Sequence, residues 1–169
     1  MDVKYSGEQV RKYTEFAKKS FSWKFIEKPV IKKHLSSFVN SNTQILDAGC
    51  GTGRLFPVLL NLKAESKNII GVDNSPDALK IANENYPEIE CIETDLRDLK
   101  LGKREFDLVV SNMVFHYFNQ EDYRKLISKF ANSLRKGGLL VFVTVHPLRF
   151  ISNHSKYFDD SSKVEKTPW

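Results

Sequence analysis

The sequence predicts an α/β protein built on a doubly wound, mostly parallel sheet of five strands. Between residues 44 and 145, short runs rich in Ile, Val and Leu alternate with longer segments of helical periodicity, which is the pattern of a parallel sheet with helices on both faces. Runs that are apolar along their whole length are typical of strands buried on both sides. A glycine-rich turn follows the first run at residues 49–53, and folds of this class bind ligands beyond the carboxyl ends of their strands.

Two helices are expected ahead of the sheet. The first spans Ser6–Phe21, where apolar residues recur at the three- and four-residue spacing of one helix face. The second spans Phe25–Val39, and Pro29 inside it predicts a kink or a new helix start.

Strands and helices then alternate along the chain. We expect strands over residues 45–48, 68–72, 89–93, 106–111 and 139–145. We expect helices over residues 55–62, 75–86 and 120–134, the second of them opened by Ser75 as N-cap and Pro76 in the first turn. The polar stretch Leu96–Arg104 is expected to form a loop or a single turn, and Lys136–Gly138 is expected to be a turn.

The composition is that of a globular protein with an uneven charge. Of the 169 residues, 41% are hydrophobic and 28% are charged, and a chain of this length fits one domain. The net charge is +5, and residues 1–34 alone hold nine Lys or Arg against four acidic residues. Such an excess fits a nucleic-acid surface, but the helical spacing of these residues favours a solvated helix face.

The sequence carries no clear targeting or metal-binding signal. Its longest apolar run, Leu139–Val145, is too short to cross a bilayer. The N-terminus lacks the apolar core of a secretory signal, so we expect a cytoplasmic location. Cys50 and Cys91 belong to no CxxC pair or zinc-spaced cluster, so we expect reduced thiols and no metal site.

Polar residues follow four consecutive predicted strands. The first strand runs into Asp47–Gly53 (DAGCGTG), Asp73 ends the second, Asp95 follows the third, and Ser111–Met113 follow the fourth. Because the carboxyl ends of parallel strands meet at one edge of a sheet, we expect these residues on one rim. A carboxylate after the second strand can there accept hydrogen bonds from a ribose diol.

The spacing of the glycines limits the class of ligand. The dinucleotide fingerprint needs a third glycine three residues after the second, and Arg54 stands at that place. The turn also lacks the Gly-Lys-Ser/Thr ending of a Walker-type loop. A ligand without a pyrophosphate is therefore favoured, and a plain glycine turn is the alternative.

These motifs, with Ile45–Arg54 (ILDAGCGTGR) at their centre, resemble the class I S-adenosylmethionine-dependent methyltransferases, in particular the small-molecule group of type 11 or 25. The resemblance runs from about Trp23 to His146. It implies S-adenosylmethionine as cofactor and S-adenosylhomocysteine as product. It also implies an N-terminal helical lid (1–40), a cofactor-binding α/β core (41–148) and the start of a substrate-covering insertion or a disordered tail (149–169).

The resemblance assigns roles to individual residues. The loop around the methionine part of the cofactor comprises Asp47, Gly49, Cys50, Gly51 and Gly53. The adenosine part is expected against Asp73 at the ribose, Asn74 beside the adenine, and Asp95 and Leu96 at the adenine edge. Asn112 and Met113 are expected near the transferable methyl group, and Tyr13 and Trp23 in the lid. His116 is the candidate catalytic residue, as a substrate contact or proton acceptor, and the alternative is that it packs over the cofactor's edge.

The function that follows is methyl transfer from S-adenosylmethionine to a small-molecule acceptor, or the cofactor-binding portion of such an enzyme. An RNA or protein methyltransferase is an alternative that the basic N-terminal helices favour. It usually carries an Asn/Asp-Pro-Pro-Tyr motif where this chain reads Ser111-Asn112-Met113-Val114. A non-catalytic S-adenosylmethionine-binding protein is a second alternative.

The end of the chain departs from the family pattern. The family's sheet has seven strands, and the polar stretch Pro147–Trp169 cannot supply two more buried strands. The fifth strand is therefore expected at an exposed edge, which favours pairing with another chain in a homodimer. No membrane partner is expected, and nucleic acid is the less favoured partner.

Overall fold

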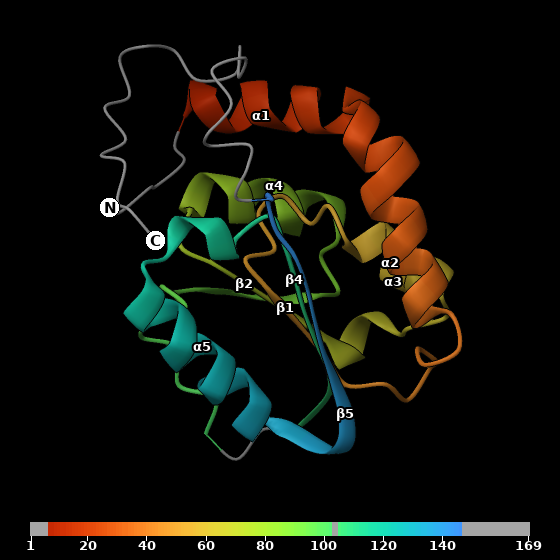
Figure 1. The fold of residues 1–169 in the computed structure, drawn as a ribbon. Coiled ribbons are helices and arrows are strands. Elements are labelled where there is room, and N and C mark those ends of the chain that lie inside the picture. Colours follow the sequence, from red (N-terminus) through yellow and green to blue (C-terminus); the bar gives the residue numbers. More distant parts are fainter. Residues whose placement is uncertain (1–6, 103–104, 147–169) are drawn as a thin grey trace.

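Five parallel strands form one sheet in the order β3-β2-β1-β4-β5 (Figure 1). The computed structural model describes residues 7–102 and 105–146. The strands are β1 (Ile45–Ala48), β2 (Ile69–Asp73), β3 (Glu90–Glu93), β4 (Phe106–Asn112) and β5 (Leu134–Val143). The chain proceeds from β1 outward to β3, then returns to the other side of β1 for β4 and β5. This reversal confirms the predicted doubly wound parallel sheet and its five strands.

Helices cover both faces of the sheet. The face with α2 (Lys28–Leu35), α3 (Phe56–Asn61) and α4 (Pro76–Asn85) buries one apolar cluster, and the face with α5 (Gln120–Asn132) buries another. Neighbouring residues of β1 serve the two clusters in turn, because successive side chains of a strand point to opposite faces: Ile45 belongs to the first and Leu46 to the second. Both are fully buried, as expected for a central strand.

The connection from β3 to β4 contains a single turn rather than a helix. Asp98 N–H donates to the Asp95 carbonyl across this turn. Leu96 and Leu99 from the same stretch are buried against the α5 cluster, so two apolar side chains of a short loop cover part of that face. The prediction of a loop or single turn is confirmed for the described residues of this connection.

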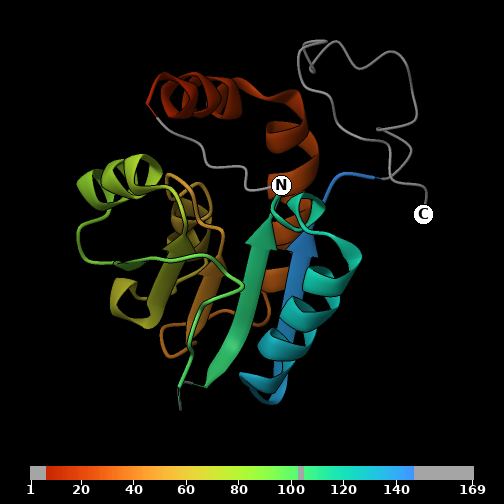
Figure 2. The ribbon, with the colours of Figure 1, turned by 90° about the vertical axis from the view of Figure 1, so that its left-hand side faces the viewer.

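The first N-terminal helix lies across the carboxyl ends of the strands, and the chain then turns down along one face of the sheet (Figure 2). Helix α1 (Glu8–Lys19) is followed by a π-helical segment, Trp23–Glu27, and by α2, which has Pro29 in its first turn. The kink or new start predicted at Pro29 corresponds to the change from π-helical to α-helical structure between Glu27 and Lys28, without a break in the helical backbone.

Some predicted element boundaries are wrong. The second helix was expected to reach Val39, whereas α2 ends at Leu35. Lys136–Gly138 was expected to be a turn before a strand, whereas β5 already begins at Leu134. Its pairing with β4 shifts register between Leu134 and Leu139, and Gly137 has a φ of 84° within that shift. The glycines therefore produce an irregularity inside a longer strand, and not the turn that was predicted.

Two further predictions concern the ends and the membrane. The predicted segment 149–169 lies outside the described residues. Across the part of the chain that the structure describes, no helix is long and apolar enough to cross a bilayer.

Candidate active site

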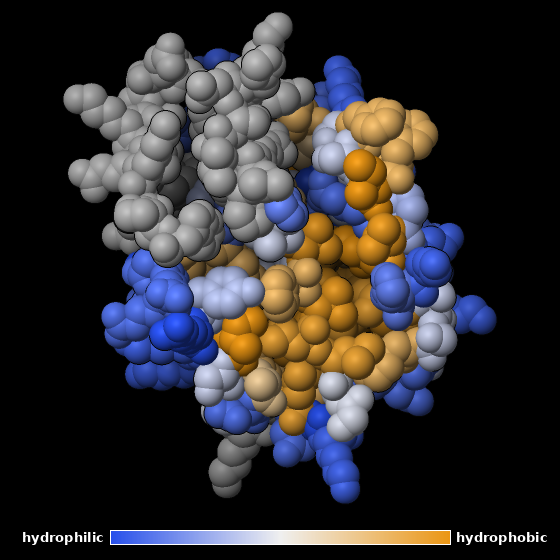
Figure 3. All heavy atoms as spheres, in the orientation of Figure 1, coloured by the Kyte–Doolittle hydropathy of each residue, from blue (hydrophilic) through white to orange (hydrophobic). Residues whose placement is uncertain are grey.

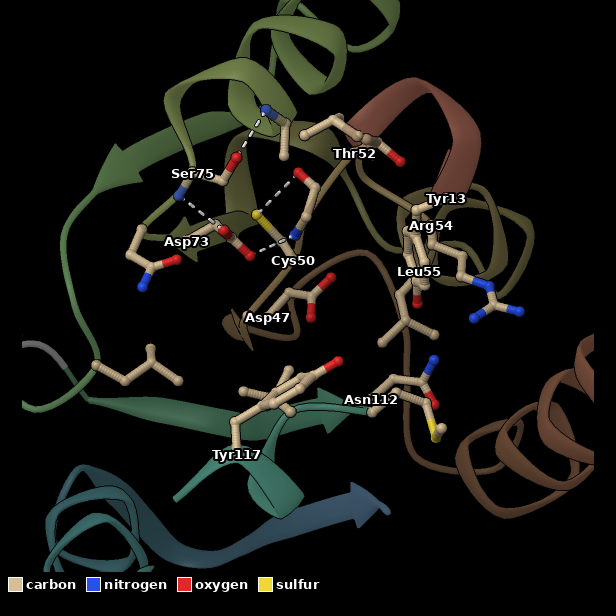
Figure 4. Close-up of a pocket in the computed structure, with 18 of the residues that line it drawn as sticks. Tyr13, Asp47, Cys50, Thr52, Arg54, Leu55, Asp73, Ser75, Asn112 and Tyr117 are labelled. Carbon is tan, nitrogen blue, oxygen red and sulfur yellow. Dashed lines mark hydrogen bonds between the residues drawn. The ribbon is translucent and has the colours of Figure 1, made fainter. Parts of the chain in front are cut away.

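A cavity of about 150 Å³ lies beyond the carboxyl ends of β1, β2 and β4, beneath α1 (Figure 4). This is the point where the strand order reverses, the usual ligand site of doubly wound sheets. The cavity wall includes most of the residues predicted for cofactor binding: Tyr13, Asp47, Gly49, Cys50, Gly51, Asp73, Asn74, Asp95, Leu96, Asn112 and Met113. Strand ends far apart in the sequence therefore meet at one site.

Three predicted residues do not line this cavity. Gly53 lies behind the wall, where a Cβ would come within 2.6 Å of the Phe56 ring. Trp23 is buried and stacks on the Arg54 guanidinium, 4.1 Å from the ring centroid. His116 lies in the short 3₁₀ helix Phe115–Tyr117, with its ring 4.1 Å from that of Tyr117, and of the two rings the one on the wall is Tyr117.

The glycine turn brings bare backbone to the cavity. Gly49 has a φ of 85° and Gly51 a φ of 54°, values that residues with a Cβ adopt at a cost. A side chain at Gly49 would collide with Val114, whereas the position of a Cβ at Gly51 has no heavy atom within 4 Å. The turn is therefore tight at Gly49 and open at Gly51, which allows a ligand to approach the main chain.

Asp73 holds this turn to the start of α4. Its Oδ2 accepts a hydrogen bond from Gly51 N–H at 2.8 Å and its Oδ1 accepts one from Ser75 N–H at 2.9 Å. Burial raises the pKa of Asp73, and backbone hydrogen bonds from Ser75, Gly51 and Asn74 offset part of that rise. The carboxylate is thus fixed in place with lone pairs left for a ligand.

The Asp47 carboxylate, unlike that of Asp73, is held by no hydrogen bond in the described structure. Its side chain is 1% exposed, and neither carboxylate oxygen has a hydrogen-bond partner among the described residues. Burial, with the nearby Asp73 carboxylate and Cys91, raises the pKa of Asp47 well above its ordinary value. A buried carboxyl without partners is costly, and a cation bound in the cavity would satisfy it.

Arg54 and Asn112 stand together at the side of the cavity away from Asp73 (Figure 4). Both contact Glu27 of the π-helical segment: Asn112 Nδ2 donates to Glu27 Oε2 at 3.3 Å, and Arg54 Nη1 lies 3.7 Å from the same oxygen. Arg54 Nε and Asn112 Oδ1 are buried without a partner in the described part of the chain. This side of the cavity therefore presents a donor and an acceptor beside the Asp47 carboxylate.

Asp95 is already paired with a neighbouring arginine. Arg97 donates to both of its oxygens, from Nε at 2.9 Å and from Nη2 at 2.8 Å, and these bonds lower the pKa of Asp95. Lys129 of α5 donates to the carbonyls of Leu96 and Arg97 at 2.9 and 2.6 Å. The hydrogen bonds from Lys129 therefore fix the backbone of the turn after β3 to α5.

Sequence comparison decides the family. A model of the methyltransferase domain matches residues 45–138, which is more than half of the chain. The chain belongs to the methyltransferase-domain family. By fold and family it belongs with the class I S-adenosylmethionine-dependent methyltransferases, and S-adenosylmethionine is the cofactor of that family.

Two curated relatives illustrate the similarity. A malonyl-[acyl-carrier protein] O-methyltransferase of Acetivibrio thermocellus is 34% identical over 121 residues, which are 69% of this chain and 41% of that protein. A ubiquinone/menaquinone biosynthesis C-methyltransferase of Campylobacter jejuni is 30% identical over 118 residues, 68% of this chain and 49% of the relative. The chain thus spans less than half the length of these two relatives.

A solved structure extends the likeness in fold. The plantazolicin methyltransferase BpumL, solved with S-adenosylhomocysteine, superposes with a TM-score of 0.71 over 92% of this chain and 60% of that one, at 18% identity. At that identity the likeness shows the shared fold alone.

The geometry of the cavity by itself fits the cofactor of the family. S-adenosylmethionine carries a ribose diol, an α-amino acid tail and a sulfonium. Asp73 offers acceptors for the diol, and the unpartnered Asp47 carboxylate offers acceptors for a positive charge. Gly51 leaves space for close approach to the main chain.

Cys50 and Cys91 lie close to each other, although they are 41 residues apart in sequence. Both are free thiols. Hydrogen bonding to Cys91 and burial raise the pKa of the Cys50 thiol well above its ordinary value. A Cβ at Gly71, the partner of Cys91 in β2, would come within 2.8 Å of Cys50 Sγ, so glycine at that position makes room for the thiol.

Sequence reasoning missed several residues of the wall and its support. The most consequential are Arg54, Glu27 and Arg97; Thr52, Leu55, Ser75 and Tyr117 also line the cavity. Arg54 directly follows the glycine turn, so its position was a usable signal. Glu27 is the single acidic residue in the basic stretch 20–36, and its burial at 7% exposure could not be read from that pattern.

Proposed function

We propose that this chain binds S-adenosylmethionine in the cavity and takes part in transferring its methyl group to a small-molecule acceptor. The observation that carries the proposal is the buried Asp47 carboxylate, unpartnered in the described structure and adjacent to a glycine turn held by Asp73. That arrangement suits a ligand that brings both a cation and a diol. The small-molecule acceptor is supported by the O-methyltransferase and C-methyltransferase activities of the two relatives.

We assign the predicted cofactor residues to the two parts of the ligand. The adenosine part is proposed to lie against Asp73, Asn74, Asp95 and Leu96, and the methionine part against Asp47, Gly49, Cys50 and Gly51. Asn112 and Met113 would lie near the methyl group, and Tyr13 would close the cavity from α1. Residues 1–40 are proposed to act as a lid, and residues 41–148 as the cofactor-binding core.

The chain's own contribution to methyl transfer would be alignment and exclusion of water. The cofactor supplies a methyl group already activated by a positive sulfur, so the protein must hold an acceptor in line with it. Val114, Tyr117 and Phe118 add apolar surface to the cavity wall, which favours a reaction that disperses charge. We assign no proton acceptor, because His116 is not on the cavity wall.

Calorimetric titration with S-adenosylmethionine and S-adenosylhomocysteine tests the proposal. We expect binding of both by the parent chain and a loss of affinity in Asp73→Ala. Absence of binding by the parent chain under conditions where it is folded would overturn the proposal. Transfer of radiolabelled methyl from the cofactor to a panel of small acids, phenols and quinols then tests the catalytic part.

A non-catalytic role in binding the cofactor is a second candidate. The two functions differ in one result: binding with no release of labelled methyl to any acceptor supports the second, and release supports the first.

The exposed edge of the sheet supports a proposed homodimer. Among the described residues, β5 pairs with β4 on one side and with no strand on the other. Apolar side chains gather on the face over β5 (Figure 3), and Phe142 is 38% exposed. Two copies could pair antiparallel along β5 about a two-fold axis. Light scattering that shows a monomer at high protein concentration would contradict this.

We further propose a cytoplasmic location, which the two free cysteines support, since reduced thiols persist there. Cell fractionation of a tagged chain tests this: recovery with secreted or periplasmic markers would contradict it.

A further inference from the structure

Glu27 contacts two residues of the cavity wall, Arg54 and Asn112. Glu27 itself belongs to the N-terminal helical region. It is 7% exposed and belongs to the π-helical segment Trp23–Glu27. Its Oε1 accepts a hydrogen bond from Ser22 Oγ at 2.7 Å, which fixes the carboxylate within its own segment. Its Oε2 faces Asn112 and Arg54, which come from the end of β4 and from the glycine turn. One carboxylate thus joins three separate elements.

The chemistry of a carboxylate determines how Asn112 is oriented. An ionised carboxylate can accept hydrogen bonds but cannot donate them, whereas the asparagine amide has one end of each kind. Contact with Glu27 therefore selects the orientation in which Asn112 Nδ2 faces Glu27. Asn112 Oδ1 is left buried without a partner in the described structure, so the amide presents an acceptor elsewhere.

Arg54 is held in a comparable way. Its Nη1 lies 3.7 Å from Glu27 Oε2, its Nη2 donates to the Ala17 carbonyl at 3.4 Å, and its plane stacks on Trp23. These three contacts engage the outer end of the guanidinium. Its Nε is buried and has no partner among the described residues.

The groups left over match an α-amino acid. Asn112 Oδ1 and the two oxygens of Asp47 are acceptors for an ammonium group, and Arg54 Nε is a donor for a carboxylate. All three residues line the same cavity. The contacts of Glu27 decide which end of the Asn112 amide and which edge of the Arg54 guanidinium remain available to a ligand.

We propose that Glu27 is a positioning residue that orients Arg54 and Asn112 to receive the amino acid tail of the ligand. The inference rests on the proposed binding of S-adenosylmethionine and adds to it a residue that does not line the cavity. A glutamine at this position would lose the charge that holds Arg54. Its amide could also donate to Asn112 Oδ1 and turn that side chain round.

A positioning role of Glu27 can be told from a general structural role by comparing two ligands, one with the amino acid tail and one without it. S-adenosylhomocysteine carries the tail, and 5′-methylthioadenosine has the same adenosine and sulfur without it. We expect Glu27→Gln to weaken S-adenosylhomocysteine roughly tenfold, as for loss of a charge-assisted hydrogen bond, and to leave 5′-methylthioadenosine unchanged. Glu121→Gln, which breaks an exposed ion pair with Lys125 on α5, is the matched control and should change neither affinity.

The outcomes are distinct. Equal weakening of both ligands by Glu27→Gln, or no weakening of either, overturns the positioning role while leaving the proposed function intact. Failure of the parent chain to bind S-adenosylhomocysteine overturns both. If Glu27→Gln does not fold, Ser22→Ala frees the carboxylate from its other hydrogen bond, and the same selective loss, smaller in size, is expected.

Discussion

The two sides of the cavity differ in how completely their polar groups are satisfied. On the side of Asp73, backbone N–H groups already hold the carboxylate, so the turn and the start of α4 are rigid before any ligand binds. On the side of Asp47, Arg54 and Asn112, buried polar atoms have no partner in the described structure. The first side is organised by the fold, whereas the second leaves polar groups that the proposed ligand would satisfy.

This difference suggests a division of labour. The prearranged side suits the rigid adenosine, because a fixed acceptor costs little to engage. The unsatisfied side suits a charged tail, because each new hydrogen bond there also removes the cost of a buried unpaired group. The same groups that weaken the empty fold would then strengthen binding.

The largest expected effect is on the prearranged side. Asp73→Ala removes the diol acceptor and also releases Gly51 N–H, so the affinity for S-adenosylhomocysteine should fall by about 1.5–3 kcal/mol, or roughly tenfold to more than a hundredfold. Asp73→Asn, which keeps one acceptor, should lose less. Asp98→Ala, an exposed aspartate of the turn after β3, serves as control in the same calorimetric titration, and an equal loss there would remove the argument.

On the unsatisfied side, Asp47→Asn should separate stability from binding. Removing a buried charge without partners should raise the unfolding free energy of the empty protein by on the order of 1 kcal/mol. The same change should weaken S-adenosylhomocysteine about tenfold, because a cation loses its counter-charge. Urea unfolding and calorimetry on the same samples measure the two effects, and a less stable variant would contradict the account.

The raised pKa of Asp47 makes a prediction about pH. Between its ordinary pKa of 3.8 and its higher folded pKa, the folded state keeps a proton that the unfolded state has lost. Stability should therefore decrease as pH rises through that window. The difference in unfolding free energy between the parent chain and Asp47→Asn isolates this contribution from that of other carboxyls. A difference that does not change with pH would show that Asp47 carries no raised pKa.

The smallest effect is expected beside Asp95. The Arg97 side chain is 38% exposed, so Arg97→Ala should cost about 0–1 kcal/mol of binding. Because this pair lies on the proposed adenosine side, S-adenosylhomocysteine and 5′-methylthioadenosine should weaken together. A loss confined to S-adenosylhomocysteine would place the tail on the wrong side of the cavity.

The sequence was sufficient to predict the sheet and the convergence of the strand ends. Parallel strands place their carboxyl ends at one edge of the sheet. Once the order of elements is recognised, it therefore follows that the strand-end residues lie together: Asp47, Asp73, Asp95 and Asn112. Local patterns contain that information, since apolar runs and glycine turns are short-range features.

The remaining features depend on contacts between distant segments. The burial of Glu27 follows from how the π-helical segment packs on Arg54, and a single acidic residue in a basic stretch gives no sign of it. The irregular start of β5 depends on its register with β4, which its own glycines do not specify. His116 and Tyr117 are adjacent in sequence, and the rotation of a short 3₁₀ helix decides which of them lines the cavity.

A crystal structure of the full chain grown with S-adenosylhomocysteine tests the division between the two sides most directly. The account predicts the ribose hydroxyls at Asp73, and the ammonium and carboxylate of the tail among Asp47, Asn112 and Arg54. A ligand bound in the reverse direction, or with its tail in solvent while Asp47 stays unpartnered, would contradict it.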